Sequence, residues 1–187
     1  KAVNIDGAAA SVENVENGSY KVVRPFNIVV KEGQTNPAVT DFTNYIMSSE
    51  GQAVVEENGY IPVGDAAAYT ADPAAEGNIV VGGSSSVSPV MEAIIEAYGE
   101  ANPNVSVELQ TTDSTTGVSS TVEGSYDIGM ASRELKEDEA AELTPTVIAT
   151  DGIAVIVNNN NPTDEMTSDQ VKQIYTGEVF SWDEIAE

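Results

Sequence analysis

Three short loops rich in hydroxyl side chains follow strand-like apolar stretches in the middle of the chain. The loops are residues 82–86, 113–117 and 132–133. Each is followed by a helical pattern, and a helix N-terminus offers unpaired backbone N–H groups and a partial positive charge. Ligands of open α/β sheets bind beyond the carboxyl ends of the strands. The three loops therefore predict one shared site for a small anion.

Arg133 is the only cation in these loops. It follows Ser132, the expected N-cap of a helix, and a guanidinium fork at this place can bind an oxyanion through two N–H groups. The alternative is a structural salt bridge to Glu134 or Glu137. We favour the ligand role.

The residues do not support catalysis. The chain has no histidine and no cysteine, so a nucleophile among Ser84, Ser85 and Ser86 would lack its usual base. The sequence contains neither a lysine-bearing phosphate loop nor a calcium-binding loop. We expect a binding protein rather than an enzyme, with no metal and no cofactor.

The acidic composition limits the partners. The formal net charge of -24 argues against nucleic acid and anionic membrane surfaces, because both require a basic patch on the protein. A small anion is compatible with this charge, since distant charges are screened beyond about 8–10 Å at physiological salt. No apolar run reaches the roughly 18 residues of a transmembrane helix, so we expect no membrane insertion by this chain.

Hydrophobic periodicity places the elements that would position the loops. A helical stripe runs from Val87 to Tyr98, with Pro89 in its first turn and Asn102 at its end. Further helices are expected over residues 37–48, 49–58, 118–123 and 134–143, with short ones after Thr167 and Ser181. Strands are expected over residues 26–30, 79–81, 105–109 and 128–130, and one or two more over 147–157, interrupted at Asp151-Gly152. The alternation favours an α/β fold.

Residues 64–77 differ from their surroundings. They are small, weakly apolar and without periodicity, which is typical of a linker or a loosely packed surface arm. Fully extended, this segment would reach at most about 50 Å. We therefore expect a linker between two structured segments, residues 1–63 and 78–187.

A resemblance to a known family is carried by both segments. The stretches GNIVVGGSSSVSPVMEAIIEAY, DSTTGVSSTVEGSYDIGMASRELK, TDGIAVIVNNNNP and YTGEVFSWDEI resemble the N-terminal domain of phosphate-binding proteins of ABC importers. These are two-domain receptors of the type II periplasmic-binding (Venus-flytrap) class. The stretches DGAAASVENVENGSYKVVRPFNIVVKEG and SSEGQAVVEENGYIPV resemble the same family's C-terminal tail, which returns to complete domain one.

The order of the two segments is inverted relative to the family. The resemblance therefore implies that residues 1–187 form one circularly permuted domain, one lobe of the receptor. The implied architecture is a three-layer α/β/α sandwich with a mixed, mostly parallel sheet. Tandem natural copies or engineering could each produce this order, and close termini make it physically acceptable.

The resemblance also implies the ligand contacts. The family's three phosphate-binding loops match Ser85, Ser86 and Val87, then Ser114, Thr115 and Thr116, then Ser132 and Arg133. The phosphate contacts expected from this match are Ser85, Ser86, Val87, Ser114, Thr115 and Arg133. Some relatives carry an aspartate near the third loop that accepts the proton of phosphate and so rejects sulfate. Arg133 stands at that place here, which leaves Asp113 and Asp151 as candidates for the proton acceptor.

The implied function is binding of inorganic phosphate by the extracytoplasmic receptor of an ABC importer. The implied setting is the cell surface or the periplasm, with a lipid anchor, a second lobe and an ABC permease in the full-length protein. The family's domain-two loop is absent from this sequence, so we expect half of the site. The alternatives are a structural or adhesive surface domain of the same fold without ligand, and a receptor lobe for another oxyanion such as sulfate.

Overall fold

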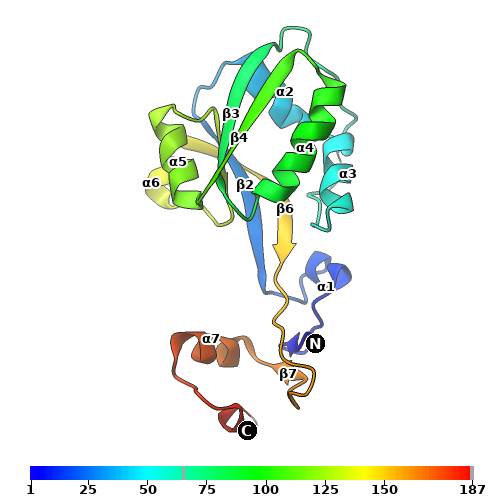
Figure 1. The fold of residues 1–187 in the computed structure, drawn as a ribbon, viewed down its shortest axis with the longest axis vertical. Coiled ribbons are helices and arrows are strands. Elements are labelled where there is room, and N and C mark those ends of the chain that lie inside the picture. The colour runs from blue at the N-terminus through cyan, green and yellow to red at the C-terminus, as the bar shows by residue number, and fades with distance from the viewer. Residues whose placement is uncertain (65, 186–187) are drawn as a thin grey trace. The chain divides into compact units, whose positions relative to one another are not determined.

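The computed structural model describes residues 1–64 and 66–185, and its ribbon is drawn in Figure 1. The chain divides into two compact units. Unit 1 joins Lys1–Arg24 to Gly152–Glu187, and unit 2 is Pro25–Asp151. Each unit therefore combines residues of the segment 1–63 with residues of the segment 78–187. Folding of the whole chain as one permuted domain stays a prediction.

Unit 2 is built on a five-stranded sheet with the order β4-β3-β5-β2-β6. Its strands are β2 (Val23–Lys31), β3 (Gly77–Ser84), β4 (Val105–Thr112), β5 (Ile128–Ala131) and β6 (Leu143–Gly152). Strand β3 pairs in parallel with β4 and β5, and β2 pairs antiparallel with β5. The N–H of Glu32, after β2, donates to the carbonyl of Glu142, before β6, so these strands also run in opposite directions. The expected mixed, mostly parallel sheet is confirmed.

Helices cover both faces of this sheet. They are α2 (Pro37–Ile46), α3 (Ser49–Glu57), α4 (Ser88–Ala101), α5 (Ser114–Glu123) and α6 (Glu137–Ala140). Neighbouring residues of β2 show the two faces: Ile28 packs in a core with α2, α3 and α4, and Val29 packs in a second core with α5. Figure 1 shows α5 and α6 on the side of the sheet away from α3 and α4. The three-layer sandwich is therefore confirmed.

Two expected helices differ from the structure near the candidate loops. Helix α5 begins at Ser114 instead of residue 118, because the side chain of Asp113 caps it by accepting from backbone N–H groups. The helix expected over 134–143 is only α6, since Leu143 is buried and already belongs to β6. Helix α4 agrees with its prediction, including Pro89 in the first turn and Asn102 as C-cap.

The arm that follows residue 64 is docked, so the expectation of loose packing is wrong. The hydroxyl of Tyr69 donates to Asp41 Oδ2 at 2.7 Å, and the N–H of Asp72 donates to Asp41 Oδ1 at 2.8 Å. The N–H of Tyr69 donates to the carboxylate of Glu50 at 2.8 Å. Ala75 is buried in the main core of unit 2. These contacts come from isolated side chains, which have no periodicity to read.

Unit 1 is small and has few regular elements. These are β1 (Asn4–Ile5), α1 (Val12–Glu16), β7 (Glu165–Met166), α7 (Ser168–Thr176) and the 3-10 helix η1 (Trp182–Glu184). Strands β1 and β7 pair in parallel, and the expected capping box of Thr167 and Gln170 begins α7. Of the eight large apolar side chains that are exposed in the described residues, all except Val147 belong to unit 1.

Candidate functional site

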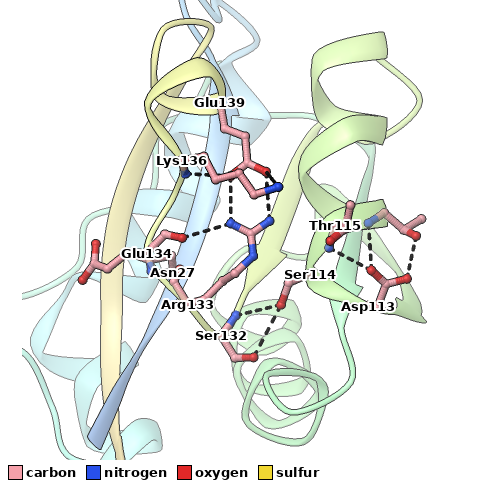
Figure 2. Close-up of polar contacts among 10 residues, drawn as sticks. Asn27, Asp113, Ser114, Thr115, Ser132, Arg133, Glu134, Lys136 and Glu139 are labelled. Carbon is pink, nitrogen blue, oxygen red and sulfur yellow. Dashed lines mark hydrogen bonds and ion pairs between the residues drawn. The ribbon is translucent and has the colours of Figure 1, made fainter.

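Three hydroxyl groups meet where strands β3, β4 and β5 end. Ser84 ends β3, Ser114 begins the helix that follows β4, and Ser132 follows β5. Ser84 Oγ donates to Ser132 Oγ at 3.0 Å, and the oxygens of Ser114 and Ser132 are 3.4 Å apart. The N–H of Ser132 also donates to Ser114 Oγ at 3.1 Å, as Figure 2 shows. We call these three residues the hydroxyl cluster.

Close backbone contact between α5 and the sheet brings the cluster together. A Cβ atom on Gly83 would lie 2.3 Å from the carbonyl oxygen of Met130, and its φ of 138° disfavours other residues. A Cβ on Gly117 would lie 2.8 Å from the Cα of Gly83. Only glycine at these positions lets the first turn of α5 reach the ends of β3 and β5.

The N-terminus of α4 has no side-chain cap. Its N-cap residue is Val87, which supplies no side-chain acceptor. The N–H of Val87 donates to the carbonyl of Ser84 at 3.0 Å. Within the described residues, the N–H groups of Ser85 and Ser86 have no acceptor, and Ser85 is exposed. This turn therefore keeps two backbone donors for a ligand.

The N-terminus of α5 is already occupied by Asp113. Its carboxylate accepts from the N–H groups of Thr115 at 2.8 Å and Thr116 at 3.1 Å, and from the Thr116 hydroxyl at 2.7 Å (Figure 2). The hydroxyl and N–H of Thr116 lower the pKa of Asp113 below its ordinary value, so its carboxylate is ionised at neutral pH. The predicted donor Thr115 therefore has its N–H engaged within the chain.

Arg133 forms an internal ion pair. Its NH1 donates to Glu139 Oε2 at 2.7 Å and its NH2 to Glu139 Oε1 at 2.9 Å. NH1 also donates to the carbonyl of Glu134. The alternative partners expected from the sequence, the carboxylates of Glu134 and Glu137, are wrong, because α6 begins at Glu137 and presents Glu139 instead.

The loop that carries Arg133 is fixed from the sheet. Asn27, buried in β2, donates its amide N–H to the carbonyl of Arg133 at 2.9 Å. The expectation that Ser132 is a helix N-cap is wrong, because α6 begins only after Lys136, which is its N-cap residue. Hydrogen bonding by Arg133 lowers the pKa of Glu139 to about 2, so the pair is fully charged at neutral pH.

The structure brings together most of the positions implied by the resemblance. Ser114 contacts Ser132 just after the end of β5, next to Arg133 in the chain. Asp113 and Thr115 flank Ser114 at the start of α5, and residues 85–87 form the turn between β3 and α4. Asp151 is the penultimate residue of β6, a strand that lies two strand spacings, about 10 Å, from β5.

Ser84 lies in the predicted loop 82–86 but is not among the predicted site residues, and the sequence pattern predicted no role for Asn27 or Glu139. Ser84 is 3% exposed at the end of an apolar strand, and a polar residue closing such a strand is a usable signal. Asn27 gives a similar signal within the apolar run of β2. Nothing local marks Glu139 among its acidic neighbours.

Two absences hold within the described residues. No group of three or more His, Cys, Asp or Glu side chains that could hold a metal ion occurs in them. None of their helices has both the length and the apolar character needed to cross a membrane.

Comparison with known families places the chain. Residues 68–187 match the model of the PBP superfamily domain. The chain belongs to this superfamily. A relative from Streptococcus agalactiae serotype V, named phosphate-binding protein PstS 2, is 52% identical over 187 residues, which are 100% of this chain and 64% of the relative. A protein of the same name from Streptococcus pneumoniae serotype 4 is 38% identical over 99% of this chain and 63% of its own length.

Solved structures agree with this family. A phosphate-binding protein of a phosphate ABC transporter from Streptococcus pneumoniae has a TM-score of 0.88 and 39% identity, over 99% of this chain and 72% of that chain. A Clostridium perfringens protein described as a phosphate ABC transporter substrate-binding protein with bound phosphate has a TM-score of 0.52 and 44% identity. It covers 58% of this chain and 45% of its own. The chain thus spans slightly less than two thirds of the length of the two streptococcal relatives named phosphate-binding protein PstS 2.

Proposed function

We propose that this chain is the larger part of an extracytoplasmic receptor that binds inorganic phosphate for an ABC importer, without chemical turnover. One observation carries the proposal. The hydroxyl cluster and the unpaired N–H groups of Ser85 and Ser86 lie at the carboxyl edge of one parallel strand group, in a chain whose whole length aligns with proteins named phosphate-binding.

The donors suit a tetrahedral oxyanion. The hydroxyl groups of Ser114 and Ser132 can rotate, so each can donate its hydrogen to a ligand oxygen instead of to the other hydroxyl. The backbone N–H groups of Ser85 and Ser86 and the partial positive charge at the start of α4 favour negative charge at the same place. Such aimed dipoles bind an anion without a large excess of cations.

Asp113 is the better candidate for the proton acceptor. Its carboxylate is ionised and lies on the residue before Ser114, whose Oγ accepts from the N–H of Ser132 in the hydroxyl cluster. The neighbours of Asp151 in β6 do not belong to that cluster. A carboxylate here would accept the proton of hydrogen phosphate and repel sulfate, which has no proton to offer at neutral pH. Preference for phosphate over sulfate is therefore part of the proposal.

The chain is proposed to hold only part of the full receptor. The curated relatives are about half as long again, at 187 residues for 64% of their length. We assign the remaining donors to the polypeptide that corresponds to this difference, together with the second lobe, a lipid anchor and contact with an ABC permease. Tyr175, Phe180 and Trp182 of unit 1 are large apolar side chains that are exposed in this chain. This exposure supports the proposal that further polypeptide covers them in the full receptor.

The inverted segment order is proposed to be natural. Single alignments to the two streptococcal relatives run through both segments, over 187 and 185 residues. An alignment of this kind requires the same order of segments in both proteins. We therefore retain residues 1–63 as the equivalent of the family's tail, residues 64–77 as the connection, and residues 78–187 as the family's N-terminal segment.

Thermal unfolding with added anions tests the proposal. Phosphate should raise the melting temperature of the chain in a concentration-dependent way, and sulfate at equal ionic strength should raise it less. Ser114→Ala should remove most of the phosphate effect, whereas Lys172→Ala, on the exposed surface of α7, should not. Equal melting temperatures with and without phosphate would support a ligand-free structural domain instead.

A further inference from the structure

Glu139 occupies the end of the Arg133 guanidinium. Its two oxygens accept from NH1 and NH2 at 2.7 Å and 2.9 Å, and the side chains are only 13% and 30% exposed for Glu139 and Arg133. A carboxylate on two parallel N–H groups has the geometry in which a phosphate binds a guanidinium. A phosphate bound to this same end of the guanidinium would therefore compete with Glu139 for the NH1 and NH2 donors of Arg133.

Glu139 is also held from its own side. The backbone N–H of Lys136 donates to Glu139 Oε2 at 2.9 Å, and Lys136 Nζ lies 3.9 Å from Oε1. The carbonyl of Arg133 is fixed by Asn27, but the long arginine side chain has several rotatable bonds. The part that can change partner is therefore the Arg133 side chain.

The guanidinium does not point at the proposed phosphate donors in this structure. Figure 2 shows it directed toward Glu139, with Ser114 and Ser132 near the base of the arginine side chain. NH1 donates both of its hydrogens, to Glu139 and to the carbonyl of Glu134, and NH2 donates one hydrogen to Glu139. An anion at the hydroxyl cluster that binds NH1 and NH2 together therefore requires release of Arg133 from Glu139.

We infer that Glu139 is an internal competitor for Arg133, which sets the affinity and the charge selectivity of the anion site. The inference rests on the proposed phosphate function. Arg133 leaves Glu139 only for an anion that attracts the guanidinium more strongly than a carboxylate does. Phosphate carries up to two negative charges near neutral pH, whereas a monoanion such as nitrate offers the guanidinium no more charge than Glu139. The competing carboxylate acts against the unwanted ligand.

Two variants of Glu139 test this role, with the affinities for phosphate and for nitrate measured by isothermal titration calorimetry. Glu139→Gln removes the competing charge, and Glu139→Asp keeps the charge but is too short to hold both nitrogens. Glu139→Gln should bind phosphate about tenfold more tightly than the unaltered chain, equivalent to roughly 1.4 kcal/mol, and should begin to bind nitrate. Glu139→Asp should show a smaller gain.

Glu137→Gln is the matched control. It removes the same charge from the same short helix, and Glu137 has no hydrogen bond to Arg133 within the described residues. Its phosphate affinity should change less than threefold. A gain as large as that of Glu139→Gln would show a general charge effect and overturn the inference.

The remaining outcomes are also decisive. If the unaltered chain binds phosphate and both Glu139 variants bind it equally or more weakly, the competitor role is wrong and Glu139 positions Arg133 for the ligand. If the unaltered chain and all variants fail to bind phosphate, the proposed function falls and this inference falls with it. Melting curves without phosphate identify a variant that is unfolded, and Glu139→Asp remains as the second variant.

Discussion

At the scale of single residues, Asp41 shows how this acidic chain stabilises a buried charge. It is 1% exposed and forms no ion pair within the described residues. Instead its carboxylate accepts from the hydroxyls of Tyr69 and Tyr98, the amide of Asn102 and the N–H of Asp72, at 2.7 to 2.8 Å. Burial raises the pKa of Asp41, but these hydrogen bonds outweigh burial, and its pKa lies below the ordinary value.

Asp41→Asn should therefore destabilise the chain. An amide cannot accept at both positions, and its NH2 group would face donors instead of acceptors. We expect a loss of about 2–4 kcal/mol in the free energy of unfolding at neutral pH, measured by urea unfolding. Asp138→Asn, on exposed α6, should change it by less than about 0.5 kcal/mol. Equal losses in both variants would contradict the role of the Asp41 cluster.

The pH dependence of Asp41 has a definite sign. Its folded pKa is lowered, so the stability it contributes is complete above its unfolded value of about 3.9 and is lost as the pH falls through the folded value. The stability difference between the unaltered chain and Asp41→Asn should therefore shrink when urea unfolding is repeated below about pH 4. A difference that grows on acidification would show that the pKa is raised.

At the scale of elements, the contact between α5 and the sheet determines whether the hydroxyl cluster can form. The helical stripe of α4 could be predicted from its sequence because its apolar side chains repeat with helical spacing. The start of α5 could not, because Ser114, Thr115 and Thr116 have weak helix propensity and the helix there depends on the Asp113 cap. The three hydroxyl-rich loops do meet at one edge of the sheet, whereas the partner of Arg133 could not be predicted because it depends on where α6 begins.

Gly117→Ala tests this contact. The added Cβ would lie 2.7 Å from the carbonyl oxygen of Met130 and 2.8 Å from the Cα of Gly83, so α5 must move outward. We expect a loss of about 1–3 kcal/mol in stability and weaker phosphate binding. Gly99→Ala is the control, because its Cβ would meet nothing within 4 Å in α4, and it should stabilise the chain by up to about 1 kcal/mol. Similar effects from both would contradict the close-contact account.

At the scale of the whole molecule, β2 links the two segments of the chain. It comes from residues 1–63, yet it lies in the sheet between β5 and β6 of the later segment. That both segments share one sheet was predicted from the resemblance, which implies one permuted domain. The sequence could not predict the docking of the connection, because Tyr69 and Asp72 reach a carboxylate that lies about thirty positions earlier.

Cleavage of the connection tests this arrangement. A protease site placed at the exposed residues 73–74 should allow the chain to be cut without separating the fragments, because β2 stays paired inside the sheet. Size-exclusion chromatography in native buffer should show one peak containing both fragments, and two peaks after denaturation. Separation in native buffer would show that the segments fold independently and would contradict the permuted lobe.

The central claim is that one anion site lies at the ends of β3, β4 and β5. An NMR titration of the isotope-labelled chain with phosphate tests it most directly, because each backbone N–H reports its own surroundings. We predict weak, saturable binding, since part of the site's donors are assigned to polypeptide beyond this chain. The largest shifts should belong to Ser85, Ser86, Ser114, Ser132 and Arg133. Shifts centred on other residues, or none at millimolar phosphate, would contradict the account.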